Sequence, residues 1–215
     1  MPVAKFKIQF ARLGDPLLNP DLPVVLEKLP RLYDAPGLLP CISSIAPAGC
    51  EERMEQLRQV KDELYAGGRF QLQFSIHSTD EAVRNRLMPA QKWNLAQVAE
   101  FGAKWWHPGD RKITLNFAVS PAIPINGDVL LQHFDPQRYL IKLTPVNPTA
   151  SAVEHGLYDP AYSERAAFAP LKVALEEKGY SVLVSIGELE ENHIGSNCGM
   201  CLRKYLEFTN RSNYL

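Results

Sequence analysis

The sequence contains little cysteine and no long apolar run. Cysteine occupies only four of the 215 positions, at 41, 50, 198 and 201. No apolar stretch approaches the ~20 residues that a membrane-spanning helix requires, and the first residues lack the regions of a signal peptide. These absences predict a cytoplasmic protein with no membrane partner. In that reducing compartment, free thiols or metal ligands are expected rather than disulfides.

A surplus of charge of either sign is also missing. The formal net charge is −1, from 23 basic and 24 acidic residues. Proteins that bind nucleic acid mainly by neutralising phosphates are usually basic. We therefore expect no DNA partner, whereas an enzyme that acts on RNA through a local basic patch stays open. The sequence also lacks a phosphate-binding P-loop, a dinucleotide-binding glycine motif and a nucleophile elbow.

What the sequence does contain is a regular alternation of strand and helix patterns. Apolar residues make up 46% and charged residues 22%, an ordinary globular mixture. Period-two alternation and short apolar runs predict six strands. They span residues 5–10, 38–43, 70–75, 113–119, 139–144 and 180–186. Because no hairpin signal separates the early strands, we expect parallel βα units in one sheet, which right-handed crossovers curl toward a barrel.

Helices are predicted between these strands. Apolar residues at helical spacing place them at about residues 19–32, 54–64, 80–88, 94–102, 128–134 and 168–175. Thr79 and Asn94 are the expected N-caps of the third and fourth helices. Gly179 ends the last one. The stretch after residue 148 is expected to be a loop as far as Phe168.

Small polar residues gather where the predicted strands end. In parallel βα folds the functional residues lie at the carboxyl ends of strands. The residues to consider are Gly14, Asp15, Ser43, Ser44, Ser75, Ile76, His77, Ser120 and Asn147. Such a rim of donors and acceptors suits a polar small molecule with amine, carboxylate and ribose groups. Ordinary turn chemistry explains the same composition, because Ser, Asn, Asp and Gly dominate loops.

Three further motifs allow more than one interpretation. His77, as a lone histidine between a strand and a helix, favours a structural role over a catalytic one. Cys198 and Cys201 form half of a zinc site without a second pair of matching spacing, or a redox pair. Trp105, Trp106 and His107 allow a base-stacking interpretation, but their position favours a helix-end aromatic cluster that packs on the core.

Five stretches, in order along the chain, resemble the radical S-adenosylmethionine (SAM) RNA adenine methyltransferases, which methylate carbon 2 of adenine in ribosomal and transfer RNA. They are residues 13–19 (Leu-Gly-Asp-Pro-Leu-Leu-Asn), 42–44 (Ile-Ser-Ser), 74–89 (from Phe-Ser-Ile-His-Ser to Leu-Met-Pro), 143–148 (Leu-Thr-Pro-Val-Asn-Pro) and 194–199 (Ile-Gly-Ser-Asn-Cys-Gly). The resemblance covers almost the whole chain.

This resemblance implies a set of site residues. Asp15 would receive the SAM amino group, and Cys198 would be the methyl-accepting, catalytic cysteine. The other SAM-binding positions would be Gly14, Ser43, Ser75, Ile76, His77 and Asn147. One SAM would methylate the cysteine, and a reduced four-iron cluster would cleave a second SAM to a 5′-deoxyadenosyl radical. RNA would be the partner, with Arg84, Arg86, Lys92 and Arg111 either near its path or simply solvated.

The four-iron cluster of the family requires a Cys-x-x-x-Cys-x-x-Cys loop after the first barrel strand, and these four cysteines do not supply it. We therefore expect an α/β fold, a partial (β/α) TIM-like half-barrel of mostly parallel strands, with the first strand and cluster loop absent. Residues 1–215 would form one domain, with the tail 187–215 carrying the Cys-x-x-Cys. The strand at residues 5–10 would be left at a sheet edge.

The favoured hypothesis is thus an enzyme that is inactive as this chain alone. Two alternatives stay open. One is a non-enzymatic SAM-binding or interaction module that has lost the cluster. The other is a cysteine-based metal or redox protein that uses Cys198 and Cys201.

Overall fold

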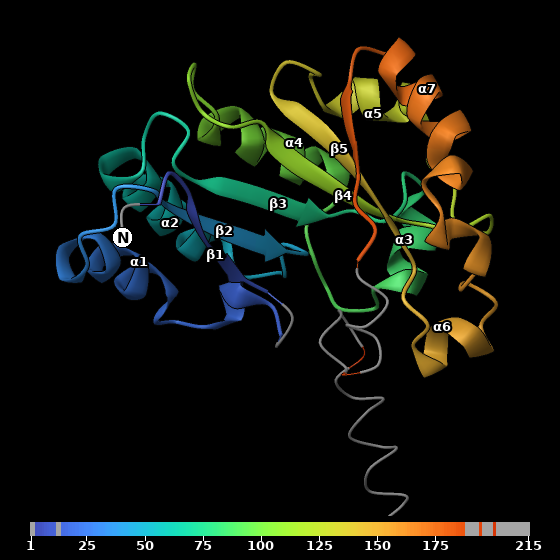
Figure 1. Cartoon of the computed structure of the whole chain (residues 1–215), viewed down its shortest axis with the longest axis horizontal. Coiled ribbons are helices and arrows are strands. Elements are labelled where there is room, and N and C mark those ends of the chain that lie inside the picture. The colour runs from blue at the N-terminus through green and yellow to red at the C-terminus, as the bar shows by residue number, and fades with distance from the viewer. Residues whose placement is uncertain (1–2, 12–13, 188–193, 195–199, 201–215) are drawn as a thin grey trace, which may run out of the picture.

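Six parallel strands form one open sheet whose order follows the chain (Figure 1). The computed structural model describes residues 3–11, 14–187, 194 and 200. The strands are β1 (Phe6–Phe10), β2 (Leu38–Ser44), β3 (Gln71–Ser75), β4 (Ile113–Val119), β5 (Tyr139–Pro145) and β6 (Ser181–Val184). All six predicted strands are present, and the partial half-barrel is confirmed. β1 lies at the sheet edge, as expected.

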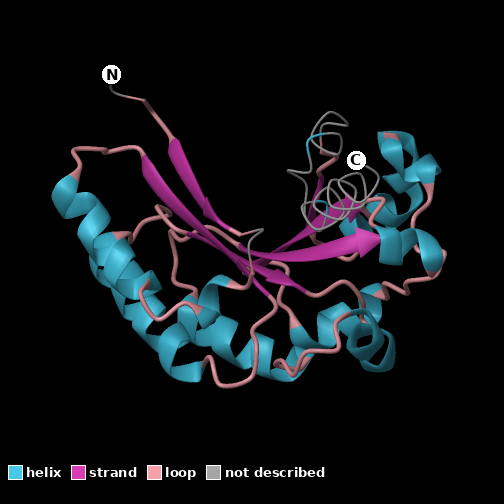
Figure 2. Cartoon of the chain, turned by 90° about the horizontal axis from the view of Figure 1, so that it is seen from below, coloured by secondary structure: helices cyan, strands magenta, loops and turns pink. Residues whose placement is uncertain are grey.

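At least one helix follows each of the first five strands, and the helices lie along the outer, convex side of the curved sheet (Figure 2). They are α1 (Leu22–Leu32), α2 (Glu51–Leu64), α3 (Glu81–Leu87), α4 (Leu95–Trp105), α5 (Gly127–His133), α6 (Ala150–Glu154) and α7 (Ala169–Glu177). Right-handed crossovers between strands in sequence order require this one-sided arrangement. None of the helices in the described part is long and apolar enough to cross a membrane.

Two details differ from the sequence-based expectation. α6 and two short 3-10 turns, Pro160–Ser163 and Arg165–Phe168, lie within the expected loop. A five-residue helix is too short to show periodicity. The expected cap Thr79 is wrong: Asp80 caps α3 by accepting from the Val83 N–H at 2.9 Å. Thr79 instead accepts from the Asn126 N–H at 2.8 Å.

The other predicted cap, Asn94, is confirmed. Its side chain accepts from the Gln97 N–H, and the Gln97 side chain accepts from the Asn94 N–H, both at 2.9 Å. This reciprocal pair satisfies two of the N–H groups that a helix start leaves without partners.

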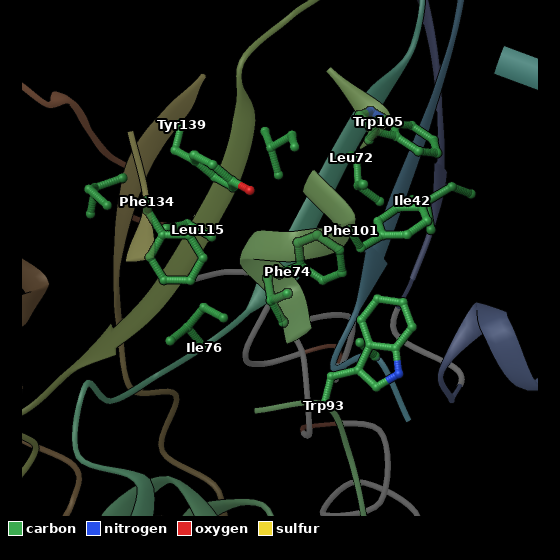
Figure 3. Packing of buried hydrophobic residues seen from close by; sticks show 14 of the residues in the cluster. Ile42, Leu72, Phe74, Ile76, Trp93, Phe101, Trp105, Leu115, Phe134 and Tyr139 are labelled. Atoms are coloured by element: carbon green, nitrogen blue, oxygen red, sulfur yellow. The ribbon is translucent and has the colours of Figure 1, made fainter. Parts of the chain in front are cut away.

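The core lies between the convex face of the sheet and the helices. Figure 3 shows Phe101 and Trp105 of α4 near Leu72 and Phe74 of β3, all within the buried core cluster. Trp105 is buried, and its ring meets that of Phe70 edge to face at 5.4 Å between centroids. For Trp105, core packing is therefore the correct interpretation.

Gly102 of α4 lies close to the Tyr139 side chain of β5. A Cβ built there would lie 1.7 Å from the Tyr139 hydroxyl oxygen. Alanine in a helix normally adds about 1 kcal/mol of stability over glycine. We expect the opposite for Gly102→Ala, a loss of about 1–3 kcal/mol from overpacking, measured as the free energy of unfolding in urea.

Two variants serve as controls. Tyr139→Phe in the Gly102→Ala background removes the nearest atom and should recover part of the loss. Ala103→Gly, at the neighbouring exposed position of α4, should show the ordinary glycine penalty. A stabilised Gly102→Ala protein would contradict the close contact.

Candidate functional site

A cavity of about 790 Å³ lies on the concave face, toward the carboxyl ends of the strands. This volume is within the range of small-molecule sites, roughly 300–1,000 Å³. Strands β1 to β5 and the segments that follow the strands contribute to its wall. The lining includes Gln9, Gly14, Asp15, Ser43, Ser75, His77, Asn116, Lys142, Asn147 and Ser185.

Six of the seven residues predicted to bind SAM line this cavity, namely Gly14, Asp15, Ser43, Ser75, His77 and Asn147. Ile76 is not among the lining residues: its side chain is fully buried in the apolar core (Figure 3). Ser120 also lies outside the lining, and its hydroxyl accepts weakly from the Ala122 N–H, which is turn chemistry. Cys198 lies outside the described residues.

The Asp15 carboxylate is already engaged by its own chain. One oxygen accepts from the Leu17 N–H at 3.0 Å, and the other accepts from the Ile45 N–H at 2.8 Å. The Ser44 hydroxyl donates to the same carboxylate at 2.8 Å. Asp15 therefore joins the segment after β1 to the end of β2, and the rim depends on it for its shape.

His77 links β3 to β4 at the cavity wall. It adopts a left-handed backbone conformation with φ of 64°, which is uncommon outside glycine. Its Nδ1 accepts from the Ala118 N–H at 3.1 Å. Burial, together with the nearby Arg84 guanidinium, lowers the pKa of His77 to about 4. The ring is neutral at pH 7, so its proton is on Nε2.

The polar residues within the strands were not predicted from the sequence. Gln9, Gln73, Asn116 and Lys142 point to the concave face and line the cavity. The pattern of β3 could have predicted such residues, because Gln71, Gln73 and Ser75 alternate with buried Leu72 and Phe74. In a half-barrel the polar side of such an alternation faces the interior.

Arg84 is neither near a surface RNA path nor solvated, because the residue is 1% exposed. Its guanidinium donates to the Trp93 carbonyl at 2.6 Å, and burial lowers its pKa. Lys92 donates to the Met88 carbonyl at 2.8 Å and Arg111 to the Gly68 carbonyl at 2.7 Å. Through these contacts all three side chains hold the backbone of nearby loops in place.

The described residues do not fit the four-iron cluster that the resemblance implies. Cluster ligands are thiolates, and burial raises the pKa of both described cysteines, that of Cys50 to about 12. Cys41 and Cys50 are free and buried. Among the described residues no group of three or more His, Cys, Asp or Glu side chains is arranged to hold a metal ion. Cys201, like Cys198, lies outside this part.

Ser44 and Ser43 provide a matched pair for testing the Asp15 connection. Ser44 is 2% exposed, and it both donates to Asp15 and accepts from the Ala46 N–H. Ser44→Ala should lower the free energy of unfolding by about 1–3 kcal/mol, because buried partners lose their hydrogen bonds. Ser43→Ala removes only the acceptor of Gln73 and should cost less. Equal losses in urea unfolding would contradict the assignment.

His77 should make stability depend on pH. Its pKa is about 4 in the folded protein and about 6.5 when unfolded. Between these values the unfolded chain binds more protons, so the contribution is fully present above pH 6.5 and lost as the pH falls toward 4. The slope should reach about 1.4 kcal/mol per pH unit.

His77→Asn is the control, since asparagine tolerates a positive φ and keeps an acceptor for the Ala118 N–H. Urea unfolding between pH 4 and 7 should show a shallower dependence in this variant. An unchanged slope would show that His77 does not carry it.

Comparison with known proteins supports the family resemblance. No family model matches the chain. A curated protein of Flavobacterium psychrophilum, named probable dual-specificity RNA methyltransferase RlmN, is 25% identical over 201 residues, covering 92% of this chain and 54% of the relative. A probable RNA methyltransferase of Rhodopseudomonas palustris is 30% identical over 120 residues, covering 54% of this chain and 31% of the relative.

The crystal structure of a radical SAM methyltransferase from Sphaerobacter thermophilus has a similar fold, with a TM-score of 0.63 and 14% sequence identity, over 90% of this chain and 54% of that one. The chain thus spans about half the length of the first curated relative and of this structure. In sequence it resembles proteins named RNA methyltransferases, and in fold it resembles a radical SAM methyltransferase.

Proposed function

We propose that this chain is the SAM-binding part of a radical SAM methyltransferase-like protein that acts on adenine in RNA. One observation carries the proposal: residues singled out at four separate strand ends meet at a single cavity of about 790 Å³. Turn chemistry alone accounts for polar residues at each strand end, but it does not require them to face one space.

The chemistry of the lining suits SAM. The hydroxyls of Ser43 and Ser75 and the amide of Asn147 offer donors and acceptors for the amino acid and ribose groups. Pro145 and Val146 add apolar surface on which an adenine ring can rest. Bound there, SAM would supply the methyl group.

In this proposal Asp15 receives the SAM ammonium group. Its carboxylate lines the cavity, and the Leu17, Ser44 and Ile45 donors hold it in place before any ligand arrives. A charged group fixed in this way loses little conformational freedom on binding. Asp15 would therefore both shape the rim and bind the ligand.

We assign no radical chemistry to the described residues, since they do not fit the cluster. We propose that the chain alone binds SAM and is inactive, with Cys198 as the methyl carrier in a complete enzyme. A non-enzymatic SAM-binding module would use the same cavity. Iron content and the absorption spectrum of the protein expressed from the full gene locus distinguish the two, because only the enzyme needs the cluster.

Calorimetric titration with SAM tests the proposal. The unmodified chain should bind SAM, and Ser75→Ala should weaken binding by about tenfold, the equivalent of one hydrogen bond of about 1.4 kcal/mol. Thr114→Ser is the control, because Thr114 lies on the concave face of β4 but outside the cavity lining. This variant should bind SAM like the unmodified chain. Absence of binding heat for the unmodified chain at millimolar SAM would refute the proposal.

A further inference from the structure

Side chains on the concave face pair with one another at the deeper levels of the sheet. The Gln71 amide donates to the Thr114 hydroxyl at 2.9 Å, which joins β3 to β4. One level nearer the rim, the Gln73 amide donates to the Ser43 hydroxyl at 2.8 Å, which joins β3 to β2. At these levels the polar face satisfies its own hydrogen bonds.

At the next level Ser75, Asn116 and Lys142 are register neighbours on β3, β4 and β5. All three line the cavity. The Asn116 residue is 8% exposed, and its Oδ1 accepts no hydrogen bond from the described part of the chain. A buried carbonyl oxygen without a partner is unfavourable, so a ligand that supplies the missing donor gains affinity there.

Ala118 keeps this amide within reach of a ligand. It is the next residue on β4 with the same orientation, and it also lines the cavity. A larger side chain would stand between Asn116 and the rim. Asn116 is therefore almost buried and still borders the cavity.

We propose that Asn116 recognises the amino edge of an adenine, an inference that rests on the proposed function. An asparagine amide pairs with adenine in two hydrogen bonds, because its oxygen accepts from the N6 amine and its nitrogen donates to N7. Pro145 and Val146 line the same cavity and offer apolar contact to the ring face. Adenine occurs both in SAM and in the proposed RNA substrate, and the experiment separates these two sources.

The first arm compares S-adenosylhomocysteine with S-inosylhomocysteine by calorimetry. Inosine carries a carbonyl acceptor in place of the N6 amine donor, so it presents two acceptors to the asparagine amide. The unmodified chain should prefer the adenine compound by about tenfold or more, in line with a bidentate pair. Asn116→Ala should abolish that preference.

Asn116→Asp and Thr114→Ser are the matched variants. The aspartate keeps an acceptor for the N6 amine and still repels the inosine carbonyl, so it should bind more weakly but retain the preference. Thr114→Ser should leave both affinity and preference unchanged. Urea unfolding of every variant shows whether a loss of binding reflects a loss of folding.

The second arm measures, by fluorescence anisotropy, the binding of a short single-stranded RNA with one adenosine or with inosine in its place, in saturating S-adenosylhomocysteine. Loss of preference by Asn116→Ala in the first arm places the SAM adenine at Asn116. Loss only in the second arm places the RNA base there.

Unchanged preferences in both arms would overturn the subsite while S-adenosylhomocysteine binding leaves the proposed function standing. An unmodified chain that binds without preferring adenine in either arm would have the same meaning. If the unmodified chain binds neither S-adenosylhomocysteine nor RNA, both proposals fall.

Discussion

The right-handed crossover is the constraint on which the rest of this structure depends. Because the six strands pair in the order in which they occur in the chain, each connecting helix crosses on the same side of the sheet. That side receives the apolar side chains, among them Phe74, Leu115 and Ile141. The opposite side is left without described helices, and there Gln73, Asn116 and Lys142 find polar surroundings rather than a core. One topological rule thus produces both the core and the polar cavity.

The same rule brings distant segments of the chain to one rim. Parallel strands place all their carboxyl ends at one edge, so residues more than a hundred positions apart border the same space. Asp15 and Ser44 show how the rim is held: their hydrogen bonds connect the segment after β1 to the end of β2. His77 makes the corresponding connection between β3 and β4 through the Ala118 N–H. The groups that border the cavity are in part the groups that hold its wall together.

Local patterns predicted much of this arrangement from sequence alone. Residues 113–119 match β4 at both ends because alternating, mostly branched apolar residues leave no other element plausible. The rim residues were also predictable, since a strand end is visible in sequence and its location in a parallel sheet follows. Contacts between distant segments were not. Arg84 is buried where a loop brings the Trp93 carbonyl to its guanidinium. Thr79 does not cap α3, because its hydroxyl accepts from the Asn126 N–H instead. Asn116 is notable because its Oδ1 has no hydrogen-bond partner among the described residues.

An open sheet differs mechanically from a closed barrel. Strand number and stagger determine the radius of a closed barrel, whereas the described strands end at β1 on one side and β6 on the other without meeting. Closure therefore does not fix the curvature of this sheet, and helices pack along its convex face. A molecule that touched both Asp15 and Ser185, which border the cavity from opposite ends of the sheet, would resist changes in the curvature of the sheet. Its binding free energy would then depend on the stiffness of the open sheet as well as on the contacts at the two ends of the molecule.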